Sequence, residues 1–130
     1  MKLLSILFCL FMGLVMSQMV LAYKEADFQQ LLKTNSCKGC NLSGATLSEA
    51  DGTVRNLRYA NLSGADLRGA NLFEADLEWA FLLGANLKGA SLYLANLKGA
   101  NLEGANLYRA NLYWANMKGA NLVQANLTKA

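Results

Sequence analysis

The chain has 130 residues, of which 54% are apolar and 16% charged, with a formal net charge of +3 at neutral pH. This length suits a single domain, and so small a charge predicts no strong electrostatic partner. The chain has no His, which excludes the commonest general base, Ser-His and Cys-His catalytic pairs, and His-containing metal sites. We therefore expect a protein that is not an enzyme and has no cofactor and no metal site.

The first 22 residues are interpreted as a secretory signal peptide. Lys2 precedes an apolar run from Leu3 to Val15, and Val20-Leu21-Ala22 forms a small-x-small cleavage site. Cleavage would leave a mature chain without a stable membrane anchor, exported to the periplasm or a thylakoid lumen or, more broadly, secreted. A retained anchor is the alternative, because the apolar run is nearly long enough to span a membrane.

Residues 23–36 are expected to form a short amphipathic helix and a linker. Phe28, Leu31 and Leu32 fall on one helical face, while acidic residues come early and Lys33 comes late, which suits the helix dipole. So short a helix needs tertiary support. Laid over the first coil of the repeats that follow, it would cover an open sheet edge. We interpret it as a cap, with a partner-binding helix as the alternative.

Residues 37–130 are dominated by a five-residue repeat of Ala, Asn or Asp, Leu and two variable positions. From Leu42 to Leu127 there are eighteen units, of which sixteen have Leu at the centre and sixteen have Ala two positions earlier. A period of five fits neither a helix nor a flat strand. A chain that presents the same residues at every fifth position turns by a constant angle, which predicts a solenoid of stacked coils.

The unit Ala60-Asn61-Leu62-Ser63-Gly64 and its successors resemble the pentapeptide-repeat family. The resemblance covers residues 40–130 and implies an all-β solenoid, a right-handed quadrilateral β-helix in which four units make one coil and Leu and Ala point inward. Residues 51–55 depart from the pattern, and we expect a local bulge there. The stretch from 31 to 45 also resembles short exported members of the family from cyanobacteria.

Cys37 and Cys40 form a Cys-x-x-Cys pair immediately before the first complete repeat. Extending the repeat register backwards directs both thiols toward the core. In an exported chain such a pair most simply forms a disulfide, with two buried reduced thiols or a redox or metal role as alternatives. A redox pair normally lies in a strand-helix-strand pattern, which is absent here.

The outward positions of the coils are not uniform. With twenty residues per coil, residues twenty apart should lie above one another at about 4.8 Å. One face then collects large aromatic residues, more follow across the next corner, and basic columns flank them. We define the aromatic wall as these seven residues: Tyr59, Phe73, Trp79, Tyr93, Leu94, Tyr113 and Trp114. Exposed residues of these types are typical of interaction sites, although stacked rings can also serve only to stabilise a sheet.

These patterns favour a non-catalytic structural or interaction module that binds an unidentified protein in the exported compartment. A homodimer through the C-terminal coil is a further hypothesis, because Met117, Leu122 and Leu127 would be exposed there.

Two other functions are alternatives. Family members that mimic DNA and interact with topoisomerase carry strong negative charge, which this chain lacks. A thiol redox protein would use Cys37 and Cys40, but both should be buried. Nucleic-acid binding is disfavoured by the small net charge and by export, although one face interleaves basic and aromatic residues, namely Arg68, Lys88, Tyr108 and Arg109.

Overall fold

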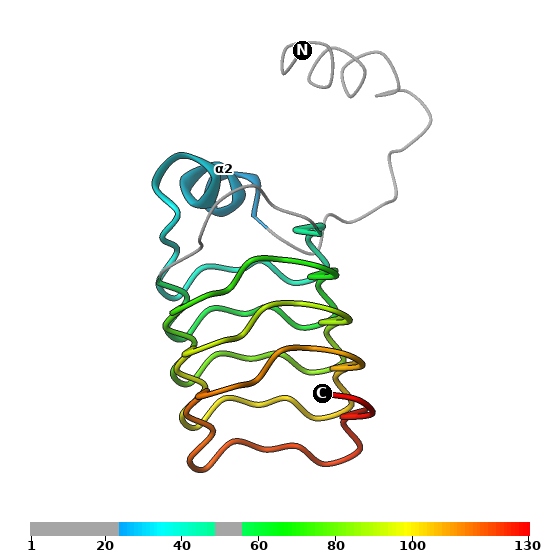
Figure 1. The fold of residues 1–130 in the computed structure, drawn as a ribbon. Helices are drawn as coiled ribbons and strands as arrows, with labels where there is room; N and C mark the ends of the chain where they lie inside the picture. The colour runs from blue at the N-terminus through cyan, green and yellow to red at the C-terminus, as the bar shows by residue number, and fades with distance from the viewer. Residues whose placement is uncertain (1–23, 49–55) are drawn as a thin grey trace, which may run out of the picture.

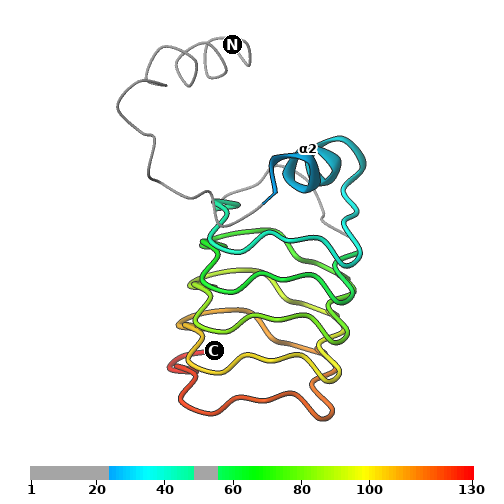
Figure 2. The ribbon, with the colours of Figure 1, turned by 180° about the vertical axis from the view of Figure 1, so that it is seen from behind.

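The structure is a computed structural model that describes residues 24–48 and 56–130. The expected signal peptide and the expected bulge at 51–55 lie outside these residues. The described chain forms one helix followed by a stack of coils, and the helix lies at the N-terminal end of the stack (Figures 1 and 2). No helix in these two ranges is long and apolar enough to cross a membrane.

The helix α2 spans Glu25–Thr34. Glu25 and Asp27 lie in its first turn and Lys33 in its last, and it ends where the left-handed Asn35 donates its backbone N–H to the carbonyl of Leu31. Leu31 is buried. The expected apolar face was wrong in one residue, because Leu32 is 56% exposed. The contact of the helix with the coil is therefore narrower than the sequence pattern predicts.

Hydrogen bonds attach α2 to the first coil. The carboxylate of Asp27 accepts the backbone N–H of Asn41 at 2.7 Å, and the N–H of Lys24 donates to the carbonyl of Asn41 at 3.1 Å. The side chain of Phe28 packs against the buried core beneath the helix. A helix of ten residues, too short to be stable alone, is thus supported by the repeats.

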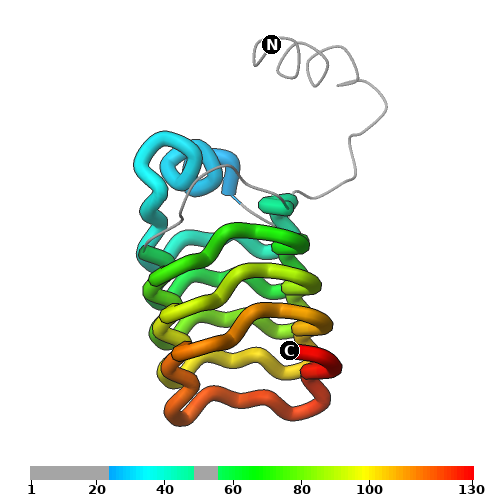
Figure 3. Tube along the Cα trace, viewed as in Figure 1, coloured from blue at the N-terminus to red at the C-terminus, as the bar shows by residue number. Residues whose placement is uncertain are grey.

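The coils are joined by parallel bridges between residues twenty apart, such as Asn86 with Asn106. Leu87 donates its N–H to the carbonyl of Asn106 at 2.8 Å, and Asn106 donates to the carbonyl of Ala85 at 2.9 Å. Each bridge in the described residues is isolated, because a tight turn follows it within the same five-residue unit. The predicted coil of twenty residues is confirmed, and Figure 3 shows successive coils lying in register.

The core consists of the Leu and Ala columns. Leu87 and Ala85 are inaccessible to solvent, as are their counterparts through most of the stack. The residue between them in the unit holds the turn: the side chain of Asn61, for example, accepts the N–H of Ser63 at 3.1 Å. Asn side chains also pair between coils, as where Asn96 donates to Asp76 at 3.0 Å. The short Asn and Asp side chains thus hold the turns through local hydrogen bonds to the backbone.

The last residue of each described five-residue unit has a left-handed backbone, with a positive φ. Gly89, with φ of 68°, adopts this conformation without cost. Side-chain-bearing residues adopt it too, at a cost of roughly 1–2 kcal/mol each. After the repeats begin, they are Tyr59, Glu74, Trp79, Leu94, Arg109, Trp114, Gln124 and Lys129.

Replacement of a core leucine should test the packing. We predict that Leu87→Ala lowers the free energy of unfolding by about 2–5 kcal/mol, because it leaves a cavity in a fully buried column. Chemical denaturation would measure the loss. The same change at the exposed Leu83 should cost about 0.5 kcal/mol or less, and equal losses at the two positions would contradict the assignment of the core.

Candidate functional site: an aromatic ladder between charged columns

Three rings of the aromatic wall stack on successive coils. The ring centroids of Phe73 and Tyr93 are 5.6 Å apart, and those of Tyr93 and Tyr113 are 5.8 Å apart, with nearly parallel planes. Trp114 meets the ring of Tyr113 edge-on at 5.5 Å. We call Phe73, Tyr93, Tyr113 and Trp114 the aromatic ladder. The structure therefore brings together four of the seven predicted residues.

Leu94 extends the ladder along its edge. It lies one coil before Trp114 in the same column, and both residues have left-handed backbones. Both side chains are exposed, Trp114 by 69%. Trp114 therefore carries the backbone strain of a non-glycine residue in the left-handed conformation, and its indole ring is not buried in the core.

Tyr59 and Trp79 are placed elsewhere. Tyr59 lines a shallow groove with Asn61 and Phe81 at the next corner, and the guanidinium of Arg58 lies over its ring. The ring of Trp79 occupies the space above Gly99, where a Cβ would overlap it. These two residues are therefore a separate apolar corner, and the exposed Phe81 belongs with them, which the sequence analysis missed because Phe81 stands at an Asn position.

A paired column of charges lies close to this corner. The carboxylate of Glu78 forms ion pairs with Arg58 and, at 3.1 Å, with Lys98. Arg58 also pairs with Asp76 at 3.2 Å. The hydrogen bond from Lys98, reinforced by the charges of Lys98 and Arg58, holds the pKa of Glu78 below its ordinary value. Arg58 and Lys98 are thus largely neutralised by Glu78 and Asp76.

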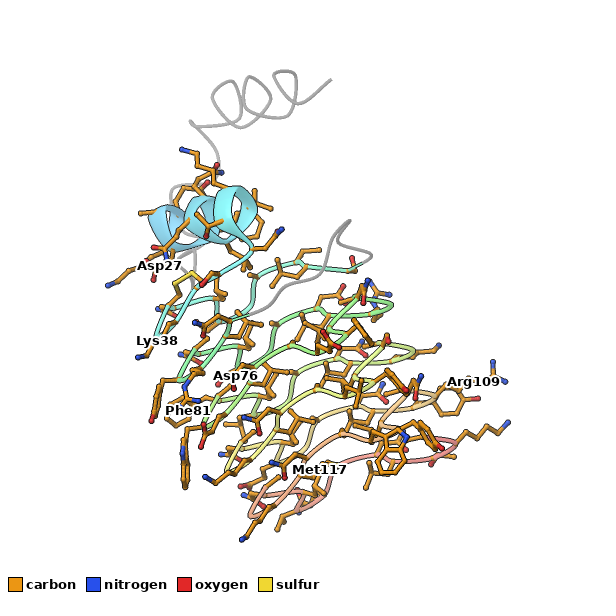
Figure 4. The ribbon with its side chains drawn as sticks, turned by 60° about the vertical axis from the view of Figure 1, so that its left-hand side comes forward. Asp27, Lys38, Asp76, Phe81, Arg109 and Met117 are labelled. Carbon is orange, nitrogen blue, oxygen red and sulfur yellow. A yellow bond between two sulfur atoms is a disulfide. The ribbon has the colours of Figure 1, made fainter. Side chains whose placement is uncertain are left out.

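A second, basic column surrounds Tyr108. The cationic groups of Lys88, Arg109 and Lys129 lie 5.7, 5.3 and 5.9 Å from the centre of its ring. Further along the column Arg68 pairs with Asp66 at 2.7 Å, which lowers the pKa of Asp66 through the hydrogen bond from Arg68. Figure 4 shows Arg109 projecting from the coil on the side away from Phe81 and Asp76.

Cys37 and Cys40 form a disulfide, as the sequence analysis favoured. Both residues are buried, and Sγ of Cys37 lies 3.0 Å from the carbonyl oxygen of Asp27 in α2. The disulfide therefore lies beneath the helix, within the first coil, where the N–H of Cys37 donates to the carbonyl of Asn56 in the next coil.

The stacked coils define a β-solenoid protein, and the sequence identifies the family to which it belongs. The family model described as "Pentapeptide repeats (8 copies)" matches residues 36–72, 70–107 and 105–130, which is most of the chain. The chain belongs to the pentapeptide-repeat family, whose members fold as right-handed quadrilateral β-helices.

Solved structures include similar proteins. The chain is 40% identical to a pentapeptide repeat protein from the thylakoid lumen of Arabidopsis thaliana, covering 70% of this chain and 68% of that one, with a TM-score of 0.47. It is 32% identical to one from the cyanobacterium Cyanothece 51142, covering 74% and 92%, with a TM-score of 0.42. No curated protein sequence gives a significant match.

The packing of Trp79 can be tested with two glycines. Gly99 and Gly104 have the same backbone conformation, with φ of 66° and 65°, so an alanine at either should cost roughly 1 kcal/mol in strain. Only Gly99→Ala also displaces the indole of Trp79. We predict a larger fall in melting temperature and a red shift of tryptophan fluorescence for Gly99→Ala. Equal behaviour of the two variants would contradict this packing.

The paired column predicts a pH dependence. A carboxyl group whose pKa is depressed by folding stabilises the protein above its unfolded pKa, about 4.3 for Glu. That stabilisation is lost as the pH falls through the folded pKa. We predict that Lys98→Gln raises the pKa of Glu78, measured by carboxyl chemical shifts. Lys118→Gln, in the same column but without a recorded ion pair to Glu78, should leave it unchanged; equal shifts would contradict the specific pairing.

Proposed function

We propose that this protein is a non-catalytic exported module that presents its aromatic ladder to a protein partner. The observation that carries the proposal is the exposed Trp114, held edge-on against the ring of Tyr113 with a left-handed backbone. Tyr and Trp are the residues that most often anchor protein interfaces.

A purely structural role explains only part of the ladder. Stacking of Phe73, Tyr93 and Tyr113 contributes about 0.2–1 kcal/mol per pair to sheet stability. Leu94 and Trp114, in contrast, each carry roughly 1–2 kcal/mol of backbone strain and remain exposed. A glycine, as found at this position in other units, would avoid that strain. Contact with a partner would bury these side chains and offset it.

Export to the periplasm or a thylakoid lumen forms part of the proposal. The expected signal peptide over residues 1–22 supports it, and the similarity to a thylakoid lumen protein is consistent with it. In such a compartment the disulfide of Cys37 and Cys40 would persist. The helix α2 would then act as a cap that shields the first coil from edge-to-edge pairing.

The alternative functions have less support. A DNA mimic needs columns of acidic residues, whereas the column around Tyr108 is basic. A thiol redox protein needs an accessible sulfur, whereas Cys37 and Cys40 are buried under α2. Self-association through the last coil, where Leu127 is exposed, stays a prediction.

Site-specific photocrosslinking tests the ladder as an interface. A photoreactive phenylalanine analogue at Tyr113, which is 64% exposed, should crosslink to a defined partner in the exported compartment. The same analogue at Val123, 58% exposed and two units along the coil on the opposite face, provides the matched control and should not. In the protein that carries the analogue at position 113, the additional changes Tyr93→Ser and Trp114→Ser should abolish the crosslinked product. The circular dichroism spectrum should be unchanged. Equal crosslinking from both faces would reject the proposal.

A further inference from the structure

Three cations converge on a single tyrosine ring. Lys88, Arg109 and Lys129 come from different coils, yet all lie within 5.9 Å of the centre of the Tyr108 ring. Among residues 24–48 and 56–130 no acidic side chain forms an ion pair with any of the three. The ring holds the cations together by its electron-rich face, but it neutralises none of them.

Three other cations of the coils are paired. Arg58 and Lys98 share the carboxylate of Glu78, and Arg68 pairs with Asp66. Lys38 and Lys118 form no ion pair among the described residues either. Around Tyr108, however, three unpaired cations gather at one ring, on a face that neighbours the aromatic ladder. The net charge of the whole chain, which is only +3, does not reveal this local concentration of positive charge.

The backbone of this column is also unusual. Arg109 and Lys129, with φ of 58° and 60°, stand where the preceding coils have Gly69 and Gly89. Each long cationic side chain thus carries left-handed strain that glycine avoids. The two glycines line a shallow groove, together with Ser48, Arg68, Lys88 and Arg109. Above Gly89 nothing lies within 4 Å of the place where a side chain would begin, so the groove is open.

We propose that this groove, together with Lys129 beside the Tyr108 ring, binds an acidic polypeptide segment whose neighbouring carboxylates pair with Lys88, Arg109 and Lys129. The three cations arise from three successive coils, which span about 10 Å at 4.8 Å per coil. An extended peptide covers that distance with three or four residues. Carboxylates are the matching charge, and the guanidinium of Arg109 can bind one of them through two hydrogen bonds.

A polypeptide fits better than a nucleic acid. Nucleic-acid affinity rests on many phosphate contacts along a continuous basic surface, whereas this surface offers three unpaired cations and ends near the carboxylate of Asp66. The extension to a natural partner rests on the proposed function: a partner with an acidic segment beside apolar residues could contact the groove and the aromatic ladder together.

Fluorescence anisotropy with a labelled hexa-aspartate peptide tests the groove itself. At low ionic strength the protein should bind this peptide and not a hexa-serine peptide, and it should bind a single-stranded hexanucleotide more weakly. Lys88→Gln/Arg109→Gln/Lys129→Gln should weaken peptide binding at least tenfold.

The matched control is Lys38→Gln/Lys98→Gln/Lys118→Gln. It removes the same three charges, from +3 to zero, but in the column that contains Glu78, and binding should stay within threefold of the unsubstituted protein. Equal loss in the two triple variants, tighter binding of the oligonucleotide or no peptide binding would each overturn the proposal. Circular dichroism verifies that the variants are folded.

One more variant separates this inference from the proposed function. Tyr93→Ser/Trp114→Ser leaves the groove intact and should bind hexa-aspartate normally. In the protein with an intact ladder, normal peptide binding without a partner crosslink at position 113 would reject the ladder as an interface and support the groove. A crosslink that depends on the ladder, in a protein that fails to bind the peptide, would reject the groove alone.

Discussion

The backbone N–H and C=O groups of each coil form hydrogen bonds with the coils before and after it. Every other feature of the fold depends on this constraint. Leu87 donates its N–H to Asn106, and Asn106 donates in turn to the carbonyl of Ala85. A single five-residue unit has no partner for these groups within itself, so it cannot fold alone. The Leu and Ala columns bury the interior only while residues twenty apart stay in register, which is why a change of spacing would be more disruptive than a change of residue.

The same register organises the surface into columns. Phe73, Tyr93 and Tyr113 stack at 5.6–5.8 Å because the coils beneath them are fixed, and Glu78 reaches Arg58 and Lys98 for the same reason. The character of a face is therefore decided by three or four side chains. A family with a uniform interior can in this way present different surfaces, and in this chain an aromatic ladder lies between a paired column and a basic one.

The sequence predicted the coil length, the buried residues and the members of each column, because each follows from the repeat register. It favoured the disulfide of Cys37 with Cys40 from their spacing in a chain expected to be exported. It did not predict the exposure of Leu32, because the helical period shows which residues share a face and not how much of that face the first coil covers. It placed Tyr59 and Trp79 across the next corner from Tyr93, but it did not show that Phe81 lies with them. It also missed the convergence of Lys88, Arg109 and Lys129 on Tyr108, because the register fixes backbone positions while long side chains choose among rotamers.

The left-handed position at the end of each unit separates scaffold from surface function. Glycine is the low-strain residue there, so a large side chain carries strain that a contact can offset. The exposed Glu74 and Gln124 carry the same strain. Some large side chains have such a contact within the molecule. Trp79 packs over Gly99, and the guanidinium of Arg58 lies over the ring of Tyr59. Leu94 and Trp114 are exposed, while Arg109 and Lys129 rest against a ring that leaves their charge unpaired. Their compensation would have to come from outside the chain, and these four residues belong to the two surfaces for which we propose partners.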